Sequence, residues 1–117
     1  MKLRDLAREL GLQNLTPALD ARQDVEVHAG HSSDLLSDVL ANAPSGGLLV
    51  TLQIHLNTIA VALHAHLVAV VVPAGLEPEP EVVERAEEEG ILLYVTGEST
   101  FDVVGRLWAL GLRGGRG

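Results

Sequence analysis

Two groups of polar residues carry the side chains of this sequence that could do chemistry. The first, Gly30 to Asp34, reads Gly-His-Ser-Ser-Asp, and the second, Gln53 to Asn57, reads Gln-Ile-His-Leu-Asn. Each group follows an apolar segment that we expect to be a strand, and the turns after parallel strands meet at one edge of a sheet. We therefore expect one shared binding edge. Its candidate ligand-binding residues are Gly30, His31, Ser32, Ser33, Asp34, Gln53, His55 and Asn57.

The first group has the composition of an anion site at the start of a helix. Free backbone N–H groups and the helix dipole attract anions there, especially beside a glycine and two hydroxyls. A more common use of Ser32 or Ser33 in such a place is to cap the helix. Asp34 would repel a bound anion. No Gly-x-x-x-x-Gly-Lys-Ser/Thr string is present, so we do not expect nucleoside triphosphate hydrolysis.

The second group has polar residues at alternate positions. Thr51, Gln53 and His55 would project on one side of a strand, with Asn57 just past its end. Either they line a ligand crevice at the edge of the sheet, or His55 and Asn57 satisfy local backbone groups in the turn. The sequence favours neither interpretation over the other.

Acid–base or metal chemistry is a third use of these side chains. His31 and His55 would face each other if their strands are neighbours, and with Asp34 or Asp38 they could bind a divalent metal or exchange protons. However, no nucleophile and base stand at a diagnostic spacing. We therefore assign no catalytic residue and no metal ligand, and expect a chain that is not an enzyme.

Apolar segments along the chain alternate between strand and helix periodicity. Together they predict a single α/β domain over residues 1–110, a three-layer sandwich with a mostly parallel sheet of about four or five strands flanked by helices. Residues 111–117 are expected to be a flexible tail. The expected strands are 25–28, 48–54, 66–72 and 91–95, with 15–19 as an edge strand or connector, and the expected helices are 3–10, 33–42, 57–65, 81–89 and one that begins near 99.

Composition and the N-terminal sequence argue against several kinds of partner and compartment. The formal net charge of −8 argues against nucleic acids and anionic membranes, which need clustered Lys and Arg. The chain has no cysteine, so disulfides and thiolate sites are excluded and a reducing compartment fits. The N-terminus lacks the apolar stretch of a signal peptide, and the most apolar run, residues 59–73, is too short to cross a bilayer. We expect a cytoplasmic protein with neither a nucleic-acid nor a membrane partner.

A family resemblance covers nearly the whole chain. The segments that carry it are Gly30, 33–41 (Ser-Asp-Leu-Leu-Ser-Asp-Val-Leu-Ala), 53–62 (Gln-Ile-His-Leu-Asn-Thr-Ile-Ala-Val-Ala), Arg85 to Ile91, and Thr96 to Phe101. This pattern resembles a stand-alone member of the DRTGG-domain family, although the string that names the family is absent and residues 24–30 read Asp-Val-Glu-Val-His-Ala-Gly.

The resemblance implies an α/β fold like the N-terminal domain of the HPr kinase/phosphorylase, without the kinase domain and hence without catalysis. Related domains accompany phosphotransacetylase domains and the regulatory regions of some inorganic pyrophosphatases, which are similar to adenine-nucleotide sensors and are often dimeric. The resemblance thus implies a homodimer, for which Ile59, Val61 and Leu63 are candidate contacts.

Our leading hypothesis is a non-catalytic regulatory or ligand-sensing domain. It would bind an adenine nucleotide or another small anion at the C-terminal edge of the sheet, and we assign no further cofactor. The alternative is a protein-interaction or oligomerisation domain without a small-molecule ligand. A small metal-assisted enzyme that uses His31, His55 and Asp34 is the third and least favoured hypothesis.

Overall fold

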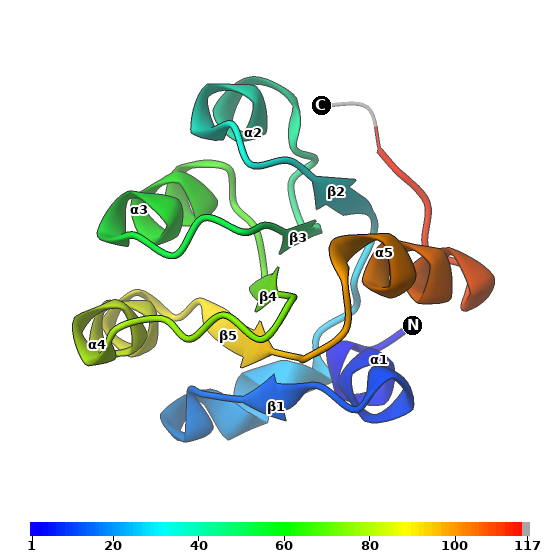
Figure 1. Cartoon of the computed structure of the whole chain (residues 1–117), viewed down its shortest axis with the longest axis horizontal. Coiled ribbons are helices and arrows are strands. Elements are labelled where there is room, and N and C mark those ends of the chain that lie inside the picture. The colour runs from blue at the N-terminus through cyan, green and yellow to red at the C-terminus, as the bar shows by residue number, and fades with distance from the viewer. Residues whose placement is uncertain (116–117) are drawn as a thin grey trace.

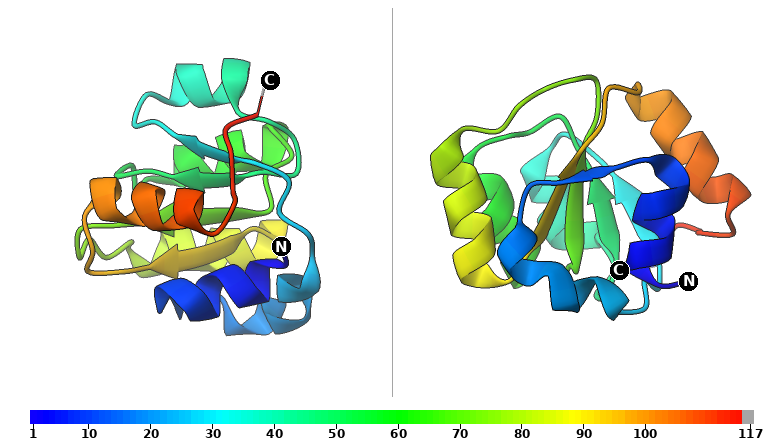
Figure 2. Two further views of the ribbon diagram at one scale, coloured as in Figure 1. Left: turned by 90° about the vertical axis from the view of Figure 1, so that its right-hand side faces the viewer. Right: turned by 90° about the horizontal axis from the view of Figure 1, so that it is seen from below.

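The alternating strands and helices of the chain form three layers (Figure 1). The computed structural model describes residues 1–115. A five-stranded sheet in the order β1-β5-β4-β3-β2 is the middle layer. Helices α2, α3 and α4 cover one face of the sheet, and α1 and α5 cover the other, as both views in Figure 2 show. The predicted α/β sandwich is confirmed.

The sheet is mixed rather than purely parallel. Strands β2, β3, β4 and β5 are parallel to one another, and the two-residue β1 pairs antiparallel with β5 at the edge. In chain order the elements are α1 (Leu3–Leu10), β1 (Gln13–Asn14), the 3₁₀ helix η1 (Pro17–Asp24), β2 (Gly30–Ser32), α2 (Leu36–Asn42), β3 (Leu48–Val50), α3 (Leu56–His64), β4 (Ala69–Val72), α4 (Pro80–Glu89), β5 (Leu92–Val95) and α5 (Thr100–Ala109).

Several element boundaries follow from local signals that the sequence displays. Gly11 and Gly90 end α1 and α4 with positive φ angles of 66° and 75°, which glycine adopts without steric cost. Ser99 begins α5, and its hydroxyl accepts a hydrogen bond from the backbone N–H of Asp102 at 3.1 Å. These predicted ends of helices are confirmed.

The first strand of the parallel sheet is not where the sequence predicted it. Residues 25–28 alternate between apolar and polar side chains but pair with the N-terminus, where Lys2 bridges Glu26 and the N–H of Val27 donates to the carbonyl of Met1. The segment that lies beside β3 is β2, Gly30–Ser32. The predicted strand over 25–28 is therefore wrong, because its backbone already has another partner.

Residues 15–19, predicted to be either an edge strand or a connector, do not form a strand. Pro17 starts η1, since its fixed φ suits the first turn of a helix and its missing N–H cannot join a ladder. The edge strand β1 ends three residues earlier, at Asn14. The Asn14 side chain then accepts hydrogen bonds from the N–H and the hydroxyl of Thr16, both at 2.8 Å, in the segment between β1 and η1.

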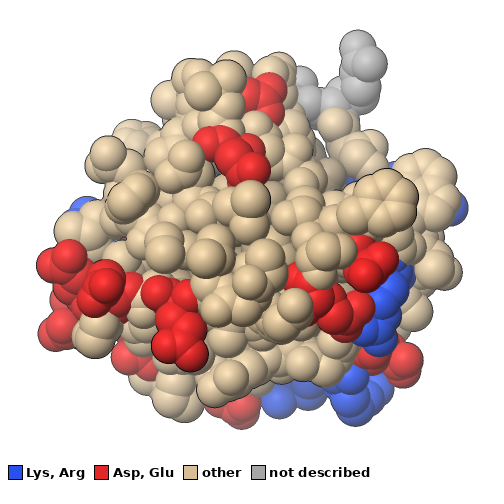
Figure 3. Space-filling model, viewed as in Figure 1, with Lys and Arg blue, Asp and Glu red and all other residues tan. Residues whose placement is uncertain are grey.

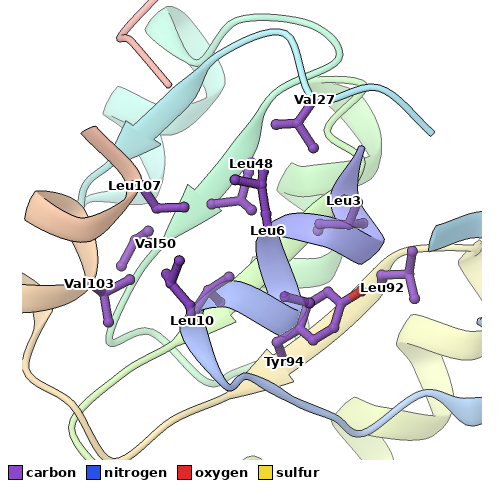
Figure 4. Close-up of a cluster of buried hydrophobic side chains, with 13 residues drawn as sticks. Leu3, Leu6, Leu10, Val27, Leu48, Val50, Leu92, Tyr94, Val103 and Leu107 are labelled. Atoms are coloured by element: carbon purple, nitrogen blue, oxygen red, sulfur yellow. The ribbon is translucent and has the colours of Figure 1, made fainter. Parts of the chain in front are cut away.

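Each face of the sheet has its own hydrophobic core. On the α1 and α5 side, the packed side chains include that of Tyr94, which is fully buried (Figure 4). Its hydroxyl donates to Oε1 of Gln23 at 2.7 Å, and burial raises the pKa of Tyr94 to about 12. The main residues of this cluster are Leu3, Leu6, Leu10, Val27, Leu48, Val50, Leu92, Tyr94, Val103 and Leu107.

Tyr94, the sole tyrosine, is expected to weaken the fold at high pH. Its pKa is raised from 10.0 to about 12, so the unfolded chain releases the phenolic proton first as the pH rises. The stabilisation by the neutral buried phenol is complete below about pH 10 and is lost as the pH rises through about 12. Denaturant unfolding across this range measures the loss, and tyrosinate absorbance measures the pKa. A folded-state pKa near 10 would contradict this expectation.

The C-terminal segment lies against the outer edge of β2. The N–H of Gly30 donates to the carbonyl of Arg113 at 2.9 Å, and Gly114 forms a parallel bridge to Gly30. Figure 2 shows this segment passing beside the strand after α5 ends. Of the tail predicted over 111–117, residues 111–115 occupy this edge, and Arg116 and Gly117 lie outside the described residues.

No helix within residues 1–115 is both long enough and apolar enough to cross a membrane.

Candidate functional site

The first predicted group belongs to a strand rather than to a turn. Gly30, His31 and Ser32 form β2. Ser32 pairs with Val50, whose side chain lies in the core on the face of the sheet that α1 and α5 cover. His31 pairs with Leu49, whose side chain lies in the core on the opposite face. Because side chains alternate along a strand, the sheet itself separates Ser32 from the imidazole of His31.

Neither serine caps the helix that follows. Helix α2 begins at Leu36 after Leu35 as its N-cap residue, and no side chain caps it. The Ser33 hydroxyl accepts from the N–H of Leu35 at 3.2 Å instead. The predicted helix start beside Gly30 is therefore wrong, since β2 extends to Ser32 and a short loop precedes α2.

His31 links β2 to α2. Its Nε2 lies 2.9 Å from Oδ2 of Asp38, and the other carboxylate oxygen of Asp38 accepts from the Asn42 amide at 2.8 Å. The hydrogen bond from Asn42, followed by that from His31, lowers the pKa of Asp38 below its usual value. Of the predicted partners of His31, Asp38 is the one that contacts it.

Asp34 joins the loops that follow β2 and β3. Its Oδ1 accepts from the backbone N–H of Leu52 at 2.7 Å and from the Thr51 hydroxyl at 3.2 Å, and its carbonyl accepts from the Gln53 amide at 3.0 Å. The structure thus brings Asp34 and Gln53 together at the predicted edge. Asp34 and Gln53 thus bond to each other and to neighbouring residues of the two loops.

The rest of the second predicted group stands at the start of α3. Strand β3 ends at Val50, so these residues belong to a loop rather than to a strand face. His55, not Asn57, is the N-cap residue, and both are exposed. They line a hollow of about 350 Å³ together with Glu79 and Glu81. An anion bound there would face two carboxylates, which works against the anion hypothesis at this hollow.

The surface around this edge is acidic. Figure 3 views the molecule from the side on which the parallel strands end, and on this face Asp and Glu outnumber Lys and Arg. The basic side chains on it gather mainly at the lower right, away from α3 and α4. Within residues 1–115, no three His, Cys, Asp or Glu side chains form a group that could hold a metal ion.

A second hollow lies on the other side of β2, between this strand, α5 and the C-terminal segment. Its volume is about 220 Å³, and its walls are mostly apolar. The predicted residues Gly30, His31 and Ser32 contribute to it. Its walls also include Val50, Val104, Leu107, Trp108, Leu112, Arg113 and Gly114.

An aromatic ring and a guanidinium stack in the wall of this hollow. The guanidinium carbon of Arg113 lies 3.7 Å from the centre of the Trp108 ring, within the range of a cation–π contact. Arg113 Nη1 also donates to the carbonyl of Trp108 at 2.8 Å and to that of Leu112 at 3.1 Å. These bonds to the carbonyl end of α5 hold the guanidinium in place.

Sequence reasoning missed this arrangement. Trp108 lies in the helix that was expected to begin near residue 99, and Arg113 lies in the expected tail over residues 111–117. The available signal was the chain's composition, since its 117 residues include one Trp, one Tyr and one Phe. A tryptophan followed five residues later by an arginine, near the end of a helix, is a pair that a cation–π contact can join.

Comparisons with known proteins show the fold alone. No protein-family model matches this chain, and no curated protein matches it in sequence. A solved structure of similar fold is the CBS and DRTGG domain portion of the regulatory region of Clostridium perfringens pyrophosphatase, complexed with its activator diadenosine tetraphosphate. The TM-score is 0.74 at 15% identity, and the match covers 96% of this chain and 47% of that one. This likeness supports a DRTGG-related α/β fold.

Proposed function

We propose that this chain is a non-catalytic regulatory domain that senses an adenine nucleotide, or another small anion with a planar ring. The observation that carries the proposal is the hollow between β2 and α5, where the ring of Trp108 and the guanidinium of Arg113 lie together. Of the residues predicted from the sequence, Gly30 and Ser32 would contact the ligand at this hollow. The proposed site therefore lies on the α5 side of β2 and not at the acidic edge near α3.

The size and chemistry of the hollow suit one heteroaromatic ring. Its volume of about 220 Å³ is below the roughly 300–1,000 Å³ of sites that enclose a drug-sized ligand. A base would pack against the apolar wall, and the exposed Ser32 hydroxyl could bond to its polar edge. The phosphates would then extend into solvent past Arg113, which supplies positive charge for them.

The fold likeness supports a regulatory role. The similar portion of the pyrophosphatase is a regulatory region, and its activator contains two adenosines joined by phosphates. The present chain spans about half the length of that portion, with 47% of it covered. By analogy, this domain would report nucleotide binding to another domain or protein.

The sole tryptophan allows a direct test of the proposed site. The 117-residue chain would be titrated with ATP, diadenosine tetraphosphate and inorganic tripolyphosphate, with Trp108 emission and calorimetry as readouts. We expect saturable changes with the two nucleotides and weaker binding of tripolyphosphate, which has no ring. Absence of heat and of emission change at millimolar nucleotide, in folded protein, would refute the proposal.

Arg113→Ala is expected to raise the nucleotide Kd about 5- to 30-fold, because it removes a charge-assisted contact of roughly 1 to 2 kcal/mol. The matched control is Arg85→Ala on α4, where Arg85 pairs with Glu89 at 3.1 Å, far from the hollow. If His55→Ala or Asn57→Ala weakens binding and Arg113→Ala does not, the ligand lies instead at the edge predicted from the sequence.

A second candidate function is a protein-interaction domain without a small-molecule ligand. The observation that favours it is the exposed apolar face of α5, where Phe101 is 87% exposed. This candidate predicts no nucleotide binding and loss of a protein partner when Phe101 is made polar. The nucleotide titration described above therefore distinguishes the two candidate functions.

A further inference from the structure

The C-terminal segment, residues 111–115, covers the outer edge of β2 and also forms part of the hollow beside Trp108. The carbonyl of Arg113 accepts a hydrogen bond from the N–H of Gly30 at 2.9 Å, and Gly114 bridges Gly30. Leu112, Arg113 and Gly114 line the hollow. One short piece of chain thus pairs with the sheet and lines the proposed nucleotide site.

The fit of this segment depends on glycine at a position outside the hollow. A Cβ on Gly115 would lie 2.8 Å from Cβ of Pro44 and 3.0 Å from Cβ of Ala29. Both distances are well inside the roughly 3.5–4.0 Å of an optimal carbon–carbon contact. Gly115 is not among the residues that line the hollow. Its close packing therefore helps to hold the segment in place without any contact to a ligand there.

The segment is attached more lightly than the strand it covers. Leu112 is half-buried and packs against the core beneath α1 and α5, while the other four residues of the segment are exposed. In contrast, β2 pairs with β3 along its whole length on the inner side. Parts of a fold that have few buried contacts open more readily than the core. The segment can therefore leave β2 while the rest of the domain stays folded.

We propose that a nucleotide in the hollow holds the C-terminal segment on β2, and that loss of the nucleotide lets the segment detach, an inference that rests on the proposed function. A ligand shifts an equilibrium between two states by as much as its affinities for them differ. When the segment detaches, the hollow loses Leu112, Arg113 and Gly114 from its walls. The detached state therefore binds the nucleotide more weakly, and the outer edge of β2 reports whether the site is occupied.

The expected size of this coupling follows from the contacts that detachment removes. Loss of the Arg113 side chain alone is expected to raise the nucleotide Kd about 5- to 30-fold. Detachment removes that side chain and two further wall residues, so it should weaken binding at least as much. Because coupling between two events is reciprocal, saturating nucleotide should make detachment rarer by about 10-fold or more.

Hydrogen exchange at the Gly30 amide reads this equilibrium directly, because its acceptor, the Arg113 carbonyl, lies on the segment. Exchange would be followed by NMR in the 117-residue chain, with and without saturating ATP. We expect ATP to slow exchange at Gly30 by about 10-fold or more. The control is the Leu15 amide at the opposite edge of the sheet, which donates to the Leu93 carbonyl at the same distance, 2.9 Å. Equal slowing of both amides would indicate a general stabilisation and would overturn the proposal.

Gly115→Val tests the coupling in the other direction. The larger side chain should push the segment off β2, remove most of the protection of the Gly30 amide and raise the ATP Kd about 5-fold or more, although residue 115 does not line the hollow. The matched control is Gly97→Val, since a Cβ at Gly97 would meet nothing within 4 Å. Protection of Gly30 that survives Gly115→Val, or loss of that protection with an unchanged Kd, would overturn the proposal.

Calorimetry on the same samples separates failure of this inference from failure of the proposed function. If ATP binds and the exchange of the Gly30 amide does not change, the coupling is wrong and the proposed nucleotide site still stands. If no heat is released at millimolar ATP, the proposed function is refuted, and the coupling is refuted with it.

Discussion

Ile59→Ala is expected to lower the free energy of unfolding by about 2 to 5 kcal/mol. Ile59 is 0% exposed and packs in the core between α3 and the sheet. Removing its outer carbons forfeits their burial and leaves a cavity that the surrounding side chains fill only in part. Urea unfolding followed by circular dichroism measures the change.

The matched control for this substitution is Leu63→Ala on the same helix. Leu63 is 41% exposed, so its truncation should cost less than about 1 kcal/mol. The resemblance to dimeric sensors suggested Ile59 and Leu63 as parts of one dimer contact, and the structure corrects this for Ile59, whose side chain is not accessible to a partner. Equal losses for the two variants would contradict the burial of Ile59 described above.

Asp34→Ala is expected to lower the free energy of unfolding by about 1 to 2 kcal/mol. The carboxylate accepts two hydrogen bonds, from the N–H of Leu52 and the hydroxyl of Thr51, and Thr51 is 0% exposed. Without the Asp34 carboxylate these two donors lose their acceptor, while the Gln53 amide can still donate to the backbone carbonyl of residue 34, so the link between the loops after β2 and β3 is weakened. Faster hydrogen exchange at the Leu52 amide would report the same opening locally.

Asp34→Asn is the conservative counterpart, because the amide keeps an oxygen that can accept both hydrogen bonds. We expect it to retain more than half of the stability that Asp34→Ala loses. If Asp34→Ala leaves the stability unchanged, the two loops do not depend on this link, and the carboxylate becomes available for a ligand at the edge.

The fold was predictable because its signals are local. The apolar segments that became β3, β4 and β5 are nearly continuous, as buried parallel strands require. The glycine at the end of α4 and the serine before α5 mark ends that depend only on neighbouring residues. Alternation of these strands with helices was enough to predict a mostly parallel sheet between two helical layers.

The position of β2 was not predictable, because it depends on contacts between distant residues. Residues 25–28 alternate between apolar and polar side chains more regularly than residues 30–32 do. However, their backbone pairs with the N-terminal residues Met1 and Lys2. This moves the strand to Gly30–Ser32 and turns a predicted loop into a strand. The hollow beside Trp108 escaped prediction for the same reason, since one of its walls exists only because Arg113 and Gly114 lie along Gly30.

The cover over β2 also affects how this protein avoids aggregation. A sheet edge with free N–H and C=O groups is a template on which strands of other molecules can add. At one edge of this sheet the outermost strand is the antiparallel β1, which has only two residues, and at the other edge Gly114 bridges Gly30 of β2. Residues 111–115 thus limit the access of a foreign strand to β2. Cutting the chain after Leu110 would expose β2, and we expect such a truncated protein to form strand-paired aggregates that the full chain avoids.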